Sequence, residues 1–103
     1  GIVGLETAAA LVYDGLVTPG KLTLARFAEV FSAGPAKAFG LPGGALSVGS
    51  PADVTAFDPR RRWKVASAEF LSLSRNTPFE GRELTGAPAA TIVGGRVVWR
   101  RPG

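Results

Sequence analysis

The sequence predicts an α/β chain in which a helical part comes first and a strand-rich part second. Three observations support this division. Apolar residues recur at helical spacing up to about residue 40, short β-rich runs dominate the rest, and a cluster of Gly and Pro residues at 40–44 separates the two. Helices followed by strands, rather than alternating with them, indicate two structural regions.

The helical part contains three predicted segments. Residues 2–13 carry apolar side chains near helical spacing, and the loop "DGLVTPG" follows them. Thr23 is expected to cap a helix over 24–32, because a Thr hydroxyl accepts a hydrogen bond from an amide of the first turn. We expect Gly34 to end that helix, and a short further helix to close at Gly40 in the left-handed conformation.

The strand-rich part contains several short runs between turns. We expect a short strand at 45–48 and a clearer one at 53–57, with "RRRWKV" as a candidate for another. The run "SAEFLSLS" indicates one helical turn or an irregular segment, and "NTPFEGRELTG" indicates a loop followed by a short strand. The run "ATIVGGRVVWRR" is the strongest hairpin pattern, because Gly94 and Gly95 separate two β-rich runs.

The composition restricts the chemistry that this chain can perform. Its 103 residues include no His and no Cys, which removes the commonest general base, the thiolate nucleophile and the usual zinc ligands. Acid–base chemistry would fall on eight carboxylates, or on Lys and Tyr. No apolar run approaches the roughly 20 residues of a membrane span. The net charge of +4 permits contact with nucleic acid without indicating it, and we expect neither a nucleic-acid nor a membrane partner.

Asp53 is the most conspicuous carboxylate because it stands at the head of an apolar strand. An acid in that position is a candidate metal ligand or general base, but no nearby residue completes such a site. We therefore expect a structural role, in which the carboxylate accepts hydrogen bonds from the backbone of the turn at 49–52.

The other candidate sites also have structural explanations. The arginines at 60–62, followed by Trp63 and Lys64, have the composition of a phosphate contact with a stacking aromatic, yet three arginines after a proline more often form a solvated turn. Ser–Lys catalysis finds no S-x-x-K motif. Glu80 and Glu83 form the closest acidic pair, which we expect to be solvated or paired with arginine. The residues by themselves indicate no self-sufficient active site.

Several motifs resemble the amidohydrolase superfamily. The segment "GLPGGALSVGSPADVTAFDP" resembles the stretch that returns the chain from the catalytic barrel to a small β domain, and "TIVGGRVVWR" resembles the closing hairpin of that domain. The segment "SAGPAKAFGLP" is similar to the preceding Asn-Pro-Ala helix, with Gly34 where Asn is usual. Two further stretches, "GIVGLETA" and "SRNTPFEGRELTG", resemble the class I dihydroorotases.

This resemblance implies a fold. The chain would be the C-terminal part of a TIM-barrel metal-dependent hydrolase, with residues 1–44 supplying the last barrel helices and residues 45–103 supplying strands of a small composite β-sandwich domain. The rest of the barrel, which takes roughly 250 residues in full, would lie upstream of Gly1. Alone, the chain would expose the surfaces that pack there, and we expect it to fold poorly or to aggregate.

The resemblance also implies a function. The enzyme would be a zinc-dependent dihydroorotase that interconverts N-carbamoyl-aspartate and dihydroorotate in pyrimidine biosynthesis. Its one or two zinc ions and its catalytic groups would be held upstream, so no catalytic and no metal-binding residue is expected here. The backbone of Gly1 is the candidate substrate contact. The expected partners are the missing barrel portion, the small-molecule substrate, and a second copy or aspartate carbamoyltransferase, all in the cytoplasm.

Other functions stay open at this point. Allantoinases and hydantoinases share parts of the loop motif and would act on related cyclic amides. A dihydroorotase homologue without its metal ligands would instead serve as a scaffold for aspartate carbamoyltransferase. An independent basic binding module belongs to a different class, and it predicts stable folding alone and salt-sensitive binding to nucleic acid.

Overall fold

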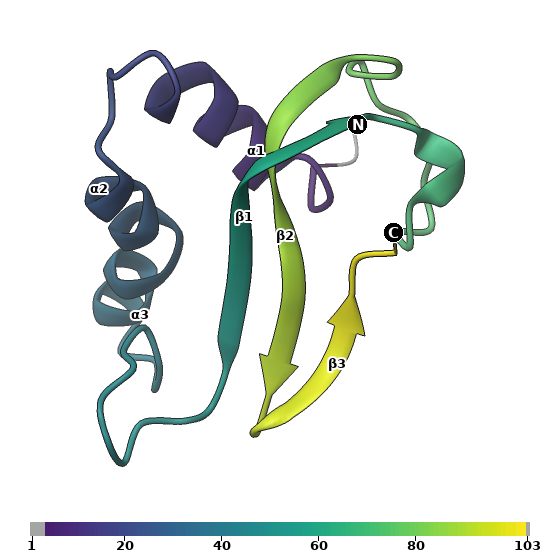
Figure 1. The fold of residues 1–103 in the computed structure, drawn as a ribbon. Helices are drawn as coiled ribbons and strands as arrows, with labels where there is room; N and C mark the ends of the chain where they lie inside the picture. Colours follow the sequence, from purple (N-terminus) through teal and green to yellow (C-terminus); the bar gives the residue numbers. More distant parts are fainter. Residues whose placement is uncertain (1–3, 103) are drawn as a thin grey trace.

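The computed structural model describes residues 4–102. It contains a three-stranded antiparallel sheet with helical segments beside it. Figure 1 shows α2 and α3 standing along the β1 side of the sheet, with β3 on the opposite side. The elements are α1 (Ala8–Val12), α2 (Leu24–Ala28), α3 (Gly34–Phe39), β1 (Val54–Lys64), β2 (Glu83–Val93) and β3 (Arg96–Arg100). The predicted order, helices before strands, is confirmed.

The first helical segment begins later and runs further than predicted. Residues 2 and 3 of the predicted helix 2–13 lie outside the described residues. The backbone carbonyl of Gly4 accepts hydrogen bonds from the amides of Thr7 and Ala8, at 3.2 and 2.9 Å. Residues 5–7 therefore form a turn before α1. A π-helical turn, Tyr13–Val17, then extends α1 into the predicted loop.

The second helical segment is continuous from α2 to α3, because the π-helical turn Glu29–Ala33 joins them. The predicted cap is confirmed, since Thr23 Oγ1 accepts a hydrogen bond from the Arg26 amide at 3.1 Å. The expectation that Gly34 ends the helix is wrong. Gly34 has a helical φ of −61°, and a Cβ there would lie 2.8 Å from the Glu29 carbonyl oxygen, so glycine lets the π turn close. Gly40 ends α3 with φ 65°, as predicted.

Each long strand merges two of the predicted runs. β1 contains the predicted strand 53–57, except for its first residue, and most of "RRRWKV". β2 contains the short strand after "NTPFEG" and the run "ATIV". The β1–β2 register shifts between Asp58 and Arg62, a stretch that includes Pro59. A second shift lies beside Phe57, which is opposite Pro88. Proline cannot donate to a ladder, so irregular pairing is where a strand tolerates it.

The short strand expected at 45–48 is absent from the described residues. Ser47 and Ser50 instead form a turn, with the Ser50 amide donating to the Ser47 carbonyl at 3.1 Å. Leu46 and Val48 are exposed, and no neighbouring strand among residues 4–102 pairs with them. β propensity alone does not make a strand, because a strand needs a partner for its backbone groups.

The predicted hairpin is confirmed. Gly94 and Gly95 connect β2 to β3 with φ of 56° and 79°, and positive φ at both central residues is the requirement of the tight turn that matches strand twist.

The core lies where α1 meets the sheet. Ala10, Val65, Phe70 and Leu84 are buried together, and Leu11, Trp63 and Phe79 pack against them. An aromatic cluster continues this core toward α2. Phe27 is 6% exposed, and its ring centre lies 5.4 Å from those of both Tyr13 and Phe57.

Gly86 lets the aromatic cluster approach β2. Its φ is 102°, and a Cβ at this position would lie 2.6 Å from Tyr13 Cδ1 and 3.2 Å from two ring atoms of Phe57. The strand therefore passes directly beneath the two rings, which only a residue without a side chain permits.

Candidate functional site

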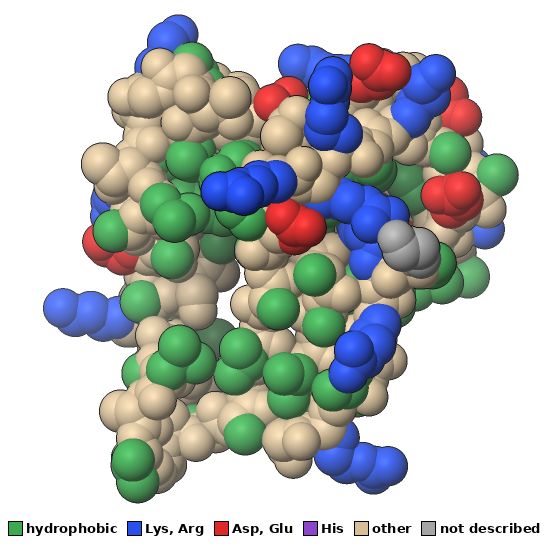
Figure 2. Space-filling model, viewed as in Figure 1, with side chains coloured by type: hydrophobic (Ala, Val, Ile, Leu, Met, Phe, Trp, Pro, Cys, Tyr) green, Lys and Arg blue, Asp and Glu red, His purple; other side chains and the backbone are tan. Residues whose placement is uncertain are grey.

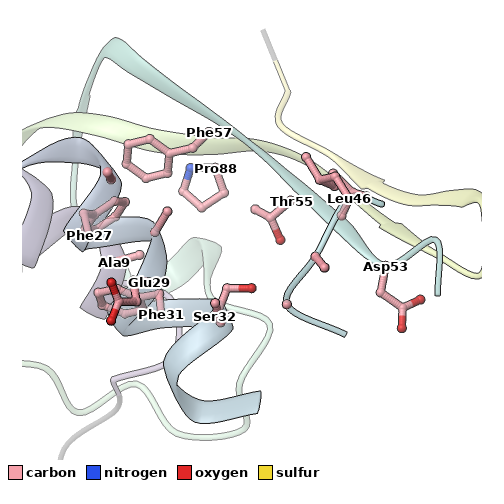
Figure 3. Close-up of a pocket in the computed structure, with 16 residues that line it drawn as sticks. Ala9, Phe27, Glu29, Phe31, Ser32, Leu46, Asp53, Thr55, Phe57 and Pro88 are labelled. Carbon is pink, nitrogen blue, oxygen red and sulfur yellow. The ribbon is translucent and has the colours of Figure 1, made fainter. Parts of the chain in front are cut away.

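A groove of about 840 Å³ runs between the helical segment and the sheet. Figure 2 shows hydrophobic side chains gathered in this hollow. In Figure 3, Phe27, Phe57 and Pro88 lie at one end of the groove, and Leu46 and Asp53 lie at the other. Few polar side chains join this lining: Glu29, Ser32 and Thr55, besides Asp53. The groove therefore offers a packing surface and not a set of convergent catalytic groups.

Asp53 turns its carboxylate away from the other groove residues in Figure 3. Its Oδ1 accepts a hydrogen bond from the Gly94 amide at 2.8 Å, and the Gly95 amide donates to the Ala52 carbonyl at 2.9 Å. The expected structural role is thus confirmed, but the expected partner, the turn at 49–52, is wrong. Antiparallel pairing places Val54 opposite Ile92, which brings the head of β1 beside the β2–β3 turn.

The basic run lies within β1, and the expectation that the arginines form a turn is wrong. A side-chain carboxylate and a backbone carbonyl bind two of its residues. The Arg60 amide donates to Asp58 Oδ1 at 2.9 Å, and Arg61 Nη2 donates to the Pro102 carbonyl at 3.1 Å. Arg62 and Lys64 pair in register with Thr85 and Glu83. These side chains do not form a common cradle, and on the face seen in Figure 2 the Lys and Arg side chains are scattered.

Arg101 belongs to a cluster that the sequence reasoning missed. Its guanidinium carbon lies 5.1 Å from the ring centre of Trp63 and 5.4 Å from that of Trp99. Its Nε donates to the Pro88 carbonyl at 2.8 Å, and Trp63 Nε1 donates to the Gly86 carbonyl at 3.0 Å. Burial, together with the nearby Arg61 charge, lowers the pKa of Arg101. The signal in the sequence was a Trp in each of two β-rich runs, Trp63 and Trp99, with an arginine two residues after the second.

Three hydrogen bonds join Glu6 to a distant loop at residues 70–76, and sequence reasoning missed this contact as well. Its Oε2 accepts hydrogen bonds from the Leu71 and Ser72 amides at 2.9 and 2.8 Å, and its Oε1 accepts one from Ser72 Oγ at 2.6 Å. These hydrogen bonds, that from the Ser72 hydroxyl first, hold the pKa of Glu6 below its ordinary value. Nothing in a single sequence shows that residues 6 and 72 meet.

The acidic pair Glu80 and Glu83 does not converge on a site. A side-chain oxygen of Glu80 accepts a hydrogen bond from the Ser67 amide at 2.8 Å, at the start of the 3-10 turn Ser67–Glu69. Glu83 lies opposite Lys64 in the β1–β2 register. Each acid thus has its own structural surroundings.

Metal binding finds no ligand set in the described part of the chain. Among residues 4–102, no group of three or more His, Cys, Asp or Glu side chains is arranged to hold an ion. Gly1, the candidate substrate contact, lies outside the described residues. Within the same range, none of the helices combines the length and the apolar character needed to cross a bilayer.

Comparison with known families identifies the chain's relatives. A model described as the amidohydrolase family matches residues 1–98. The chain belongs to this family. The motifs around Gly40, Asp53 and the closing hairpin predicted this family, and the match confirms that prediction over nearly the whole chain.

Curated relatives of this amidohydrolase chain are named dihydroorotase. One from Solibacter usitatus (strain Ellin6076) is 48% identical over 101 residues, which are 98% of this chain and 24% of the relative. One from Anaeromyxobacter sp. (strain K) is 51% identical over 98 residues, which are 95% of this chain and 22% of the relative. The chain thus spans about a quarter of the length of these relatives.

Solved structures with the same arrangement include hydantoinases. The L-hydantoinase (dihydropyrimidinase) from Arthrobacter aurescens superposes with a TM-score of 0.91 at 40% identity, over 100% of this chain and 23% of that one. The D-hydantoinase (dihydropyrimidinase) from Thermus sp. gives 0.89 at 34% identity, over 97% and 22%. The relation between helices and sheet in this amidohydrolase chain is therefore one that experimental structures share.

Proposed function

We propose that this chain is the C-terminal part of a dihydroorotase, a metal-dependent hydrolase that interconverts N-carbamoyl-aspartate and dihydroorotate. The observation that carries the proposal is 48–51% identity with dihydroorotases over 95–98% of the chain. The hydantoinase structures are less similar in sequence, at 40% and 34% identity. The reaction opens or closes a cyclic amide and would belong to pyrimidine biosynthesis.

The residues that bind the metal, which we propose to be zinc, would lie in the remaining three quarters of such a protein. The chain has no His or Cys, and its described residues hold no fitting ligand set. We therefore assign no catalytic step to this chain. Its proposed contribution to substrate binding is the backbone of Gly1, where the absence of a side chain permits close approach of a ligand.

The groove supports a proposal for how this chain joins the rest of the protein. Val54 and Thr55 both line it, although neighbouring residues of a strand point to opposite faces. A groove lined by both therefore lies along the edge of β1. Among the described residues β1 pairs with β2 alone. We propose that a strand from the upstream part pairs with this edge and completes a small β-sandwich with residues 45–103.

The helical region also has apolar side chains that the remaining protein could cover. Leu24, Phe39 and Leu41 are 58%, 78% and 59% exposed. Full burial of such side chains contributes about 1.5–3 kcal/mol each. We propose that residues 1–44 pack these side chains against the remaining barrel.

The test of function is activity of the complete protein. Purified with its metal, it should hydrolyse dihydroorotate and cyclise N-carbamoyl-aspartate, with kcat/KM at least about a hundredfold above that for hydantoin or allantoin. A preference for hydantoin would assign the alternative cyclic amidase function.

A scaffold function would give a different result in the same experiment. A complete protein that lacks turnover on all of these substrates, and that co-purifies with aspartate carbamoyltransferase, would replace the enzyme proposal by the scaffold. A second copy of the protein would be the alternative partner, and size-exclusion chromatography with light scattering distinguishes the two assemblies.

A further inference from the structure

Glu6 joins the turn before α1 to a loop that is far away in the sequence. Residues 70–76, which we call the 70–76 loop, contain no helix or strand. The Glu6 carboxylate accepts hydrogen bonds from the Leu71 amide, the Ser72 amide and the Ser72 hydroxyl, at 2.9, 2.8 and 2.6 Å. Because hydrogen bonds to a charged acceptor are about twice as strong as neutral ones, the carboxylate fixes the start of the loop against the turn.

Exposed leucines lie on both sides of this contact. Leu71 and Leu73 on the loop are 81% and 102% exposed, and Leu5, which precedes Glu6 in the turn, is 91% exposed. Leu5 and Leu71 line the same small cavity of about 300 Å³, so the two side chains lie close together. We call Leu5, Leu71 and Leu73 the leucine patch.

The cavity beside the leucine patch is mainly apolar. Trp63, Phe70, Pro88 and Trp99 line it together with the two leucines. Single exposed leucines are common on protein surfaces, whereas exposed apolar side chains that gather beside an apolar hollow mark a contact surface. A side chain of an opposing surface could therefore enter this hollow while the leucines pack around it.

The loop that carries the patch is held in position on this chain. Phe70, immediately before Leu71, is buried in the core cluster with Val65 and Leu84. Further along the loop, Arg75 Nη1 donates to the Ser72 carbonyl. A segment that is already ordered loses little conformational entropy when another surface covers it, so exposed leucines on such a loop are prepared for contact.

The size of the patch favours the remaining part of the same protein as its partner. This chain spans 24% and 22% of the two curated dihydroorotases, so about three quarters of such a protein lies outside it. At about 25 cal/mol per Å², the 1.5–3 kcal/mol gained by burying a leucine corresponds to about 60–120 Å², and three leucines to about 180–360 Å².

An interface between separate molecules needs more area than this. A stable interface between two copies buries about 800 Å² on each of them, which is more than twice what the leucine patch offers. A surface of the same polypeptide needs no such area, because the covalent connection keeps it at a high effective concentration.

The leucine patch is separate from the groove. Figure 1 shows the segment between β1 and β2 on the side of the sheet away from α2 and α3. Leu5, Leu71 and Leu73 are not among the residues that line the groove along the edge of β1. Contact at the patch would therefore add a second surface to the one proposed at the β1 edge.

We propose that the leucine patch docks the 70–76 loop onto the remaining part of the same polypeptide, so that the sheet region is held by that part on two sides. This inference rests on the proposed placement of the chain within a longer dihydroorotase. It is independent of which cyclic amide that protein acts on.

The decisive experiment places a thiol at Leu73 in the complete protein and measures its rate of reaction with N-ethylmaleimide. Leu73 is fully exposed here, so any protection of this position comes from groups outside residues 4–102. Mass spectrometry of the labelled peptide identifies the site, because this chain has no Cys of its own. The same variant unfolded in urea gives the unprotected rate.

We expect Leu73→Cys in the folded protein to react at least about tenfold more slowly than in urea. Val48→Cys is the matched control, because Val48 is 107% exposed in the Ser47–Ser50 turn and lies outside the patch. It should react at close to its unprotected rate.

A second pair of variants measures the same contact by stability. Leu73→Ala should lower the melting temperature of the complete protein by about 3 °C, because the loss of a covered side chain leaves a cavity. Val48→Ala should leave the melting temperature unchanged to within about 1 °C. Equal shifts in the two variants would overturn the inference, because the effect would then not be particular to the patch.

The labelling rate has two further outcomes that would overturn the inference. Reaction of Leu73→Cys at its unprotected rate would show that the patch stays in solvent. Protection that disappears on dilution, together with dissociation to monomers in size-exclusion chromatography with light scattering, would assign the patch to a second copy. A wild-type protein without turnover on dihydroorotate would remove the proposed function, while the labelling rate would still decide whether the patch is covered.

Discussion

The sheet region and the helical region are held together in different ways. In the sheet region, polar contacts join residues far apart in the sequence, such as Asp53 with Gly94 and Trp63 with Gly86. The segment from α2 to α3 meets the sheet at the aromatic cluster around Phe27, and it leaves Phe39 and other apolar side chains exposed. The sheet region thus carries its own cross-links, whereas the helical region presents an apolar face that the described residues do not cover.

The largest expected effect tests where the helical region is anchored. Phe27→Ala should lower the free energy of unfolding of the complete protein by about 4 kcal/mol, because a buried ring is lost and a cavity remains. Urea denaturation followed by circular dichroism measures the change. A loss below about 1 kcal/mol would show that the aromatic cluster is not the anchor.

Phe39→Ala completes that test, because Phe39 is 78% exposed in the described residues. In the complete protein we expect a loss of about 2 kcal/mol or more, since the remaining barrel would cover this ring. A loss of only a few tenths of a kcal/mol would mean that the face stays in solvent, and it would count against the proposed packing.

The next effect concerns the contact between the two regions at Gly86. Gly86→Ala should cost about 3 kcal/mol, because the new Cβ meets the Tyr13 ring and the φ of 102° strains a side chain. Gly81→Ala is the matched control: its φ is 78° with nothing within 4 Å of the new Cβ, so it should cost about 1 kcal/mol from strain alone. Equal losses in the two variants would show that the rings move aside.

The features that the sequence predicts correctly are those that depend on one or two neighbouring residues. The cap at Thr23, the stop at Gly40 and the Gly94–Gly95 turn were all predicted, because each follows from a local rule about one or two residues. The helix end at Gly34 and the strand at 45–48 were wrong, since tertiary surroundings decide whether a glycine stops a helix or a β-rich run finds a partner.

Long-range contacts account for the missed parts of the site. The structural role of Asp53 was predicted from its place at a strand head, but its partner lies 41 residues away. Glu6 and Arg101 were missed because their partners meet them only in the folded chain.

A smaller effect is expected at the cross-link of the sheet region. Asp53→Ala should lower the free energy of unfolding by about 1 kcal/mol, because the Gly94 amide loses a charged acceptor. Asp53→Asn keeps an oxygen in place and should cost about half as much. Turnover per folded molecule should stay unchanged in both variants. A large fall in kcat at unchanged stability would contradict the structural role.

The dependence of stability on pH tests the contact between Glu6 and the 70–76 loop. The pKa of Glu6 in the folded chain lies below its ordinary value of 4.5, so the folded state favours the carboxylate. Its contribution to stability is fully present above pH 4.5 and is lost as the pH falls through the folded pKa. Glu69 and Arg101 line the same small cavity as Glu6, and both remain in the Glu6→Gln variant.

The measurement is the difference in unfolding free energy between the wild type and Glu6→Gln across this range. We expect a constant advantage of the wild type above pH 4.5 and a shrinking one below it. An advantage that stays constant down to acid unfolding would show that Glu6 titrates normally and that its hydrogen bonds do not favour the charged form.

The smallest effect concerns Thr7, next to Glu6. Its side chain is 1% exposed, and its hydroxyl has no hydrogen-bond partner within residues 4–102. Buried hydroxyls in native proteins are almost always paired. Thr7→Val keeps the shape and removes the hydroxyl, so we expect a loss of about 1 kcal/mol in the complete protein if a group outside residues 4–102 binds this hydroxyl. Thr7→Ser, which keeps the hydroxyl and loses only a methyl group, is the control.

A Thr7→Val protein as stable as the wild type, or more stable, would mean that the hydroxyl is unpaired in the complete protein as well. In that case Thr7 would make no polar contact with groups outside residues 4–102. A measured loss in Thr7→Val would instead place a polar group from outside residues 4–102 against this turn. The turn would then be bound from both directions, by the 70–76 loop through Glu6 and by the rest of the protein through Thr7.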